Sequence, residues 1–211
     1  MDKPEITVYK FGGASLKNAE ALRNAVAILQ RIDTSRLILV VSAMGKTTNA
    51  LEKIHASRFN GDKKDSLLRL AELEKNHRDI VDDLFPDKNH SVYGKLTEIF
   101  SELNSELEKV PEPRFDENYD RIVSFGERIA SEIVAAYLID SGISLYLADA
   151  RVLIITDDNF RDAYVNWDIS KKNIQECCKT AFESNKLILT QGFIGGTEDG
   201  RPTTLGREGS D

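Results

Sequence analysis

The chain has 211 residues, of which 41% are hydrophobic and 30% charged, as is usual for a globular protein of one large domain. Its formal net charge of −7 argues against a general nucleic-acid surface, because phosphate backbones are bound by clustered Lys and Arg. No apolar run approaches the ~18 residues of a membrane span. We therefore expect no membrane partner. Adjacent Cys177 and Cys178 have no second pair for a disulfide framework or zinc site, so we expect a cytoplasmic protein with reduced thiols.

The first 55 residues predict alternating strands and helices. Residues 6–11 are typical of a strand, and apolar residues recur at helical spacing over residues 17–32. Residues 37–41 form a continuous apolar run, which indicates a strand buried on both faces. A loop follows, and then a helix through Leu51 and Ile54. This order predicts the start of an α/β sheet with right-handed crossovers.

A helical insertion is predicted at about residues 58–118. Residues 62–85 and 91–110 are charged and strongly helical, with prolines at 86, 111 and 113 as breaks. The second helix carries a near-heptad apolar stripe of Val92, Leu96, Ile99, Leu103 and Leu107. We interpret the pair as a helical hairpin laid against the domain, with a coiled-coil partner surface as the alternative. Alternation then resumes with a helix at 127–140, a strand at 145–147, a helix at 168–182 and a strand at 187–189.

A candidate phosphate turn follows the first strand. Gly12 and Gly13 let backbone N–H groups approach an anion closely, and Lys10 adds a full positive charge beside them. The alternative is a tight turn with a solvated lysine. Gly45-Lys46-Thr47 imitates the end of a P-loop, but the glycine required five residues before Gly45 is Val40, so this interpretation fails.

Two further segments hold charged candidates. Glu127 lies in the first turn of a predicted helix, where on sequence alone it is best explained as an acid favoured by the helix dipole. The functional alternative is that it points into the crevice at the sheet end and receives a cation such as a substrate ammonium. Residues 195–201 predict a hairpin-like turn, and the small and hydroxyl residues after it surround Arg207 and Asp211 like a second anion site.

Six blocks in this order carry a resemblance. They are Lys10-Phe11-Gly12-Gly13-Ala14-Ser15, Ser42-Ala43-Met44 with Thr48-Asn49, Ser124-Phe125-Gly126-Glu127, Asp149-Ala150-Arg151 with Thr156-Asp157, Thr190-Gln191-Gly192-Phe193-Ile194-Gly195 and Thr203-Thr204-Leu205-Gly206-Arg207. The chain resembles the aspartokinase family of the amino-acid kinase superfamily over essentially its whole length. This resemblance implies a three-layer α/β/α sandwich with a mainly parallel sheet. It also implies phosphoryl transfer from MgATP to the β-carboxylate of L-aspartate, which gives 4-phospho-L-aspartate and begins the route to lysine, threonine and methionine.

The resemblance also implies a role for each matching residue. Catalysis would depend on Lys10, which bridges phosphate oxygens, and on Asp211, which holds Lys10 in place. The other implied contacts are Gly12, Gly13 and Ser15 to the ATP phosphates, and Ser42, Thr48, Glu127, Phe193 and Arg207 to aspartate. Mg²⁺ would arrive with ATP, held mainly by phosphates and water, with no metal site made by protein alone.

Two residues depart from the family pattern, and the length departs as well. Ala14 stands where the family usually has Thr, and Glu208 where it usually has Gly. In the family, a nucleotide-binding half and regulatory ACT domains that build the dimer follow the position of Asp211. We therefore expect residues 1–211 to be the N-terminal, aspartate-binding portion of a kinase domain, inactive alone and homo-oligomeric in the full-length protein.

Two rival functions stay open. A sibling kinase of the glutamate 5-kinase or acetylglutamate kinase type would share the Lys-Gly-Gly turn but should lack the Ser-Phe-Gly-Glu and Thr-Leu-Gly-Arg pair. A non-catalytic module that binds amino acids or partners through the helical hairpin is the alternative from a different class.

Overall fold

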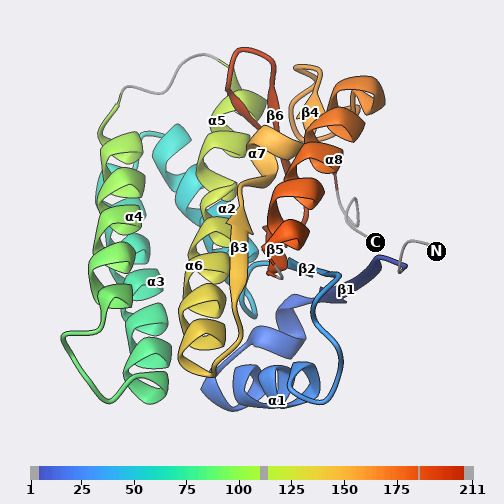
Figure 1. The fold of residues 1–211 in the computed structure, drawn as a ribbon. Helices are drawn as coiled ribbons and strands as arrows, with labels where there is room; N and C mark the ends of the chain where they lie inside the picture. Colours follow the sequence, from blue (N-terminus) through green and yellow to red (C-terminus); the bar gives the residue numbers. More distant parts are fainter. Residues whose placement is uncertain (1–4, 110–113, 185, 207–211) are drawn as a thin grey trace.

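The central sheet has four parallel strands. The structure, a computed structural model, describes residues 5–109, 114–184 and 186–206. The strand order is β1 (Thr7–Phe11), β2 (Leu37–Val41), β5 (Leu187–Gln191) and β3 (Leu145–Ala148) (Figure 1). Strands β2 and β5 occupy the middle of this sheet. β5 is buried on both faces, as an unbroken apolar run predicts, whereas Ile38 and Val40 of β2 are only half-buried on the face toward α8.

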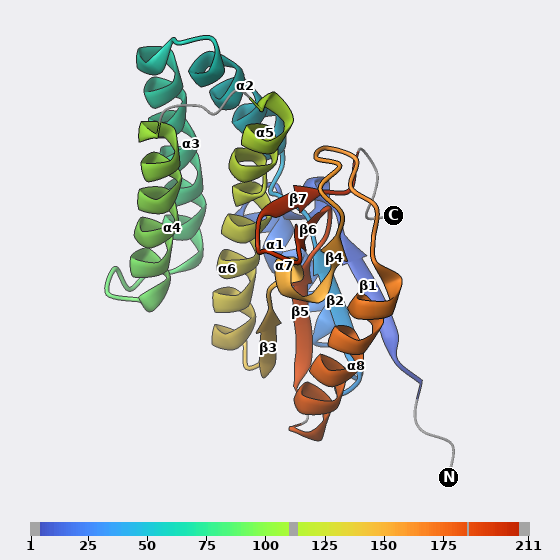
Figure 2. The same cartoon turned by 90° about the horizontal axis from the view of Figure 1, so that it is seen from above.

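Helices cover both faces of the sheet, so the expected three-layer α/β/α arrangement is confirmed. Helices α1 (Ala19–Leu29) and α6 (Phe125–Asp140) share one core with Leu39 and Leu189. On the opposite face α8 (Trp167–Glu183) packs against Ile188, as the view from above shows (Figure 2). None of the helices in the described ranges is both long and apolar enough to cross a membrane.

Two long helices form an outer layer beyond α6. They are α3 (Lys63–Leu84) and α4 (Ser91–Glu108), preceded by α2 (Thr47–Phe59). All five residues of the apolar stripe on α4 are buried within this chain. The stripe therefore packs in the domain's own core, as the hairpin interpretation predicts, and it is not available to a coiled-coil partner.

A small second sheet lies beyond the carboxyl ends of the main strands. It contains β4 (Ile155–Thr156), β6 (Ile194–Thr197) and β7 (Pro202–Thr204), with β6 and β7 antiparallel. The hairpin expected at 195–201 is thus a pair of short strands joined by a turn. Gly196 is required here, because a Cβ on it would lie 2.4 Å from the carbonyl oxygen of Arg151.

Three short helices were not predicted. They are η1, a 3₁₀ helix (Gly13–Leu16), α5 (Phe115–Val123) and α7 (Ala150–Leu153). Helix α5 runs through Ser124 directly into α6, the helix that packs on the main sheet. The position of α5 is therefore fixed relative to the sheet.

Candidate functional site

The candidate site lies where parallel strands β1, β2 and β5 end side by side. The turn after β1 and the loop after β2 are joined by hydrogen bonds from Ser42 N to Phe11 O (3.1 Å) and from Gly45 N to Gly13 O (2.9 Å). Gly13 allows this approach, because a Cβ on it would lie 2.6 Å from the carbonyl oxygen of Ala43. The carboxyl ends of parallel strands are where open α/β sheets bind ligands.

The predicted phosphate turn differs from the expected strand-to-helix turn. Gly12 has φ −73° and Gly13 is not among the residues with positive φ, so neither glycine adopts the left-handed conformation. The turn enters η1, and α1 begins only at Ala19, because the Asn18 side chain accepts a hydrogen bond from Ala21 N and fixes the helix start there. Lys10 and Ser15 are exposed at this turn.

The loop after β2 places its first residues between the sheet and α6. Ser42 and Thr48 are half-buried, and Ala43 is buried. Thr47 opens α2, and its hydroxyl lies 3.2 Å from Nε2 of the buried His77 of α3. The Nδ1–H of His77 can donate to Leu73 O at 2.8 Å, so Nε2 can accept from Thr47. The helical hairpin therefore holds the beginning of α2 in place.

Glu127 is a buried acid at this loop. Its side chain is 2% exposed, and its Oε1 accepts a hydrogen bond from Ala43 N at 3.3 Å. Its Oε2 is buried and has no hydrogen-bond partner among the described residues. Burial raises the pKa of Glu127 to about 8, although the hydrogen bond from Ala43 lowers it. A buried carboxyl with an unsatisfied oxygen is a costly arrangement that a bound cation would relieve.

Phe193 stands at the turn between β5 and β6. Its φ of +64° is uncommon for an aromatic residue, and its side chain packs partly buried against the main core. Its carbonyl accepts from Leu205 N at 2.9 Å, while Gly192 N donates to Val41 O at 2.9 Å. This turn thus joins the end of β7 to the ends of the central strands.

Eight of the predicted site residues lie at the carboxyl ends of the central strands, among them Lys10 in β1, Ser15 in η1 and Thr48 in α2, and two lie outside the described residues. The structure brings Gly12, Gly13, Ser42 and Glu127 to one sheet end, and links Phe193 to it through Gly192. Arg207 and Asp211 lie outside the described residues. Within the described ranges, no three His, Cys, Asp or Glu side chains are grouped as a metal site would require.

One buried acid near the site was not predicted. Asp120 on α5 is fully buried and accepts hydrogen bonds from Thr204 and from Arg161. The local sequence gives no signal for its burial, because Asp120 lies about 100° or more around the helix from the apolar stripe of Phe115, Tyr119 and Ile122.

Comparison with known proteins gives consistent matches. The family model described as "Amino acid kinase family" matches residues 5–211. A bifunctional aspartokinase/homoserine dehydrogenase 1 of Arabidopsis thaliana is 31% identical over 208 residues, covering 97% of this chain and 22% of that protein. An aspartokinase of Chlamydia pneumoniae is 32% identical over 205 residues, covering 97% of this chain and 42% of that protein.

The fold matches a solved structure closely. The structure of E. coli aspartokinase III in complex with lysine and aspartate gives a TM-score of 0.85 at 22% identity, covering 97% of this chain and 44% of that one. The chain spans less than half the length of these relatives.

Proposed function

Because the chain belongs to the amino acid kinase family, we propose that it forms the aspartate-binding part of an aspartate kinase, which transfers a phosphoryl group from MgATP to the β-carboxylate of L-aspartate. The observation that carries this proposal is the buried Glu127 carboxyl at the sheet end, one oxygen of which has no hydrogen-bond partner in the described part of the chain. A substrate ammonium would supply the missing partner and would favour the charged form of the acid. The similarity to aspartokinases across 97% of the chain supports the same substrate.

The acceptor in this reaction needs no general base. A carboxylate with an ordinary pKa near 3.9 is already ionised at neutral pH. Catalysis then consists of alignment and of neutralising charge on the transferring phosphoryl group. Lys10 would neutralise that charge, with Asp211 orienting it. Donors from Gly12, Gly13 and Ser15 would hold the phosphates.

The substrate would be recognised by its two charged α-groups. Glu127 receives the ammonium, and Arg207 grips the α-carboxylate in a bidentate fork. Ser42, Thr48 and Phe193 would line the aspartate pocket. Mg²⁺ would be carried by the ATP phosphates, consistent with donors that are mainly backbone N–H groups, hydroxyls and a lysine.

Substitution of Lys10 tests the catalytic role. In the full natural protein, Lys10→Ala should lower turnover with aspartate at least about 100-fold, because the lost charge neutralises the transferring phosphoryl group in the transition state. The fold should be unchanged, because the Lys10 side chain is exposed. Lys17→Ala, which removes another exposed lysine just beyond η1, is the matched control and should retain turnover.

Substrate choice separates the rival functions. We expect ATP-dependent phosphorylation of aspartate, with glutamate and N-acetylglutamate at least about 100-fold poorer in kcat/KM. A preference for glutamate or N-acetylglutamate would contradict this proposal and would indicate a sibling kinase. A full natural protein that binds aspartate but phosphorylates none of the three would be a binding module instead.

A further inference from the structure

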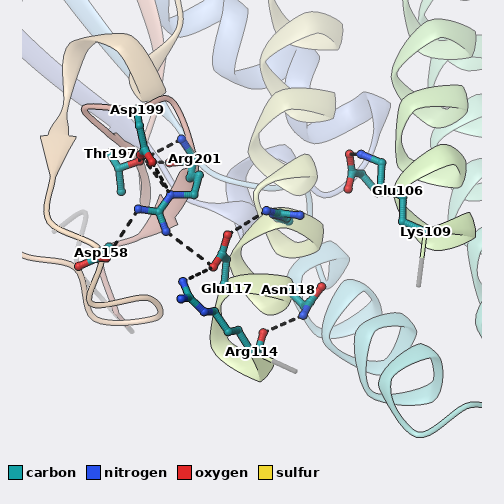
Figure 3. A network of polar contacts seen from close by, with 10 residues as sticks. Glu106, Lys109, Arg114, Glu117, Asn118, Asp158, Thr197, Asp199 and Arg201 are labelled. Carbon is teal, nitrogen blue, oxygen red and sulfur yellow. Dashed lines mark hydrogen bonds and ion pairs between the residues drawn. The ribbon is translucent and has the colours of Figure 1, made fainter. Parts of the chain in front are cut away.

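Two buried acids on α5 face the β6–β7 hairpin. Glu117 is 4% exposed and Asp120 is fully buried, and their spacing of three residues places them on the same side of the helix. Glu117 forms ion pairs with Arg114, with Arg121 and, at 3.7 Å, with Arg201 just before β7 (Figure 3). Asp120 holds the opposite end of β7, at Thr204. Helix α5 therefore holds the strand at both ends.

Asp120 contacts Thr204 through both carboxyl oxygens. Oδ2 accepts from Thr204 N at 2.9 Å, and Oδ1 accepts from the Thr204 hydroxyl at 2.7 Å. Oδ2 also accepts from Arg161 N at 2.9 Å. The Arg161 backbone has φ +68°, and Ala163 N, two residues later, donates to Thr204 O at 3.0 Å. The amide, carbonyl and hydroxyl of Thr204 are therefore all fixed by Asp120 and the loop that Asp120 holds.

This arrangement tolerates a change of protonation. Burial raises the pKa of Asp120 to about 6, although its hydrogen bonds from Thr204 and Arg161 lower it. A proton on Oδ1 could be donated to the Thr204 hydroxyl oxygen, while Oδ2 continues to accept from both amides. An asparagine at this position could make the same contacts through its amide group.

The two residues after Thr204 are fixed as well. Leu205 N donates to Phe193 O at 2.9 Å. Gly206 has φ +79°, and a Cβ on it would lie 2.7 Å from Oδ1 of Asp162. Residues 204–206 thus follow one path, held by Asp120, by the loop containing Arg161 and Asp162, and by the turn at Phe193.

We propose that Asp120 is a positioning residue for substrate recognition: by fixing Thr204, it fixes Leu205, whose N–H holds the carbonyl of Phe193, and so sets the position of Phe193 in the proposed aspartate pocket. This inference rests on the proposed function. Asp120 itself does not touch the substrate, because it is fully buried and its oxygens are occupied by Thr204 and Arg161. Its effect should therefore appear in aspartate affinity and leave ATP affinity unchanged.

The test compares four variants of the full natural protein. Asp120→Ala should raise the aspartate KM about tenfold or more, because a small displacement of a binding group is costly, while the ATP KM stays within about twofold. Asp120→Asn should restore an aspartate KM close to wild type. Thr204→Val removes only the hydroxyl donor and should give a smaller increase, which keeps the test decisive if Asp120→Ala does not fold. Glu117→Gln, at the far end of β7, is the matched control and should lower stability without changing the aspartate KM.

Hydrogen exchange supplies a second measurement on the same proteins. The amides of Thr204 and Leu205 should exchange faster in Asp120→Ala than in wild type or Asp120→Asn. The inference is overturned if aspartate and ATP KM rise together, or if Glu117→Gln raises the aspartate KM as much as Asp120→Ala. It is also overturned if exchange at Thr204 is unchanged. A wild-type protein that does not phosphorylate aspartate would instead reject the proposed function itself, which the wild-type control reveals separately.

Discussion

Glu127 combines a buried carboxyl, a hydrogen bond from Ala43 N and a pKa raised by burial to about 8. At pH 7 about nine-tenths of unliganded chains would hold a proton on this group. An ammonium ion binds the carboxylate and not the neutral acid, so aspartate binding must displace the proton. We therefore expect the release of nearly one proton per aspartate bound at pH 7 and almost none at pH 9. Calorimetry in buffers of different ionisation enthalpy measures this release directly.

The matched variant for that experiment is Glu127→Gln, which has no proton to release. It should also bind aspartate at least about tenfold more weakly, because the ammonium then lacks a charged partner. Proton release that persists in the variant, or binding enthalpies independent of buffer in the wild type, would contradict the assignment of Glu127 to the ammonium.

The same group should make stability depend on pH without any ligand. The pKa of Glu127 rises from 4.5 in the unfolded chain to about 8 in the folded one. Below about pH 4.5 both states hold the proton, and between 4.5 and 8 only the folded state does, so stability falls as pH rises through this window. The Tm of Glu127→Gln relative to wild type should therefore increase from pH 5 to pH 9, by about 5 °C or more. Differential scanning calorimetry at the two pH values checks this, and a constant difference in Tm would contradict it.

At the level of elements, the contact between α2 and α5 depends on a buried histidine. His55 on α2 is 2% exposed, and its ring lies 4.6 Å from Phe115 and 5.6 Å from Tyr119, both on α5. Burial lowers the pKa of His55 from 6.5 to about 4, and the nearby Arg161 adds to this effect. Between pH 6.5 and about pH 4 the unfolded chain binds a proton at His55 that the folded chain does not. The free energy of unfolding therefore decreases as pH falls through this range.

His55→Phe should remove this pH dependence of stability, because phenylalanine does not titrate and can keep the aromatic contacts with α5. We expect the Tm difference between wild type and variant to shift by about 5 °C between pH 7 and pH 5, with wild type losing more. Thermal unfolding followed by circular dichroism measures it. Parallel Tm curves over this range would show that His55 does not carry the proton linkage.

Elements with a long period or an unbroken apolar run could be predicted from the sequence, and several of the shorter ones could not. The strand at 37–41 was predicted to the residue because five apolar residues stand between polar ends. The helix expected from residue 17 begins at Ala19, because the Asn18 cap decides the start and the apolar spacing does not. Elements of two to four residues, such as β4 and α7, contain too few residues to show any period.

The site was predictable only as far as local chemistry reaches. Glycines and charged residues just after predicted strands pointed to the sheet end, because parallel strands end together there. The role of Asp120 could not be predicted, since its partner Thr204 is 84 residues away and only the fold brings them together. Likewise the burial of Glu127 against Ala43 joins residues 84 positions apart, so local sequence does not indicate it.

On the scale of the whole molecule, one face of the sheet is incompletely covered. A cavity of about 440 Å³ lies between α8 and the sheet, with mostly apolar walls that include Val8, Val40 and Trp167. Val8 is 59% exposed and Trp167 is 72% exposed. Large contiguous apolar surface of this kind marks an interaction site or promotes association.

We therefore expect the chain of residues 1–211, expressed alone, to associate in a concentration-dependent way through this face. Sedimentation velocity should show the association. The fluorescence of Trp167, the single tryptophan of the chain, should shift to shorter wavelength as concentration rises, because its indole leaves water.

Val8→Lys with Trp167→Glu should shift the chain toward monomer, because burying two charges in the interface is costly. Ile139→Glu changes an exposed apolar residue on α6, away from this face, and should leave association unchanged. A wild-type chain that stays monomeric at all concentrations, with fluorescence independent of concentration, would show that this apolar face does not drive association.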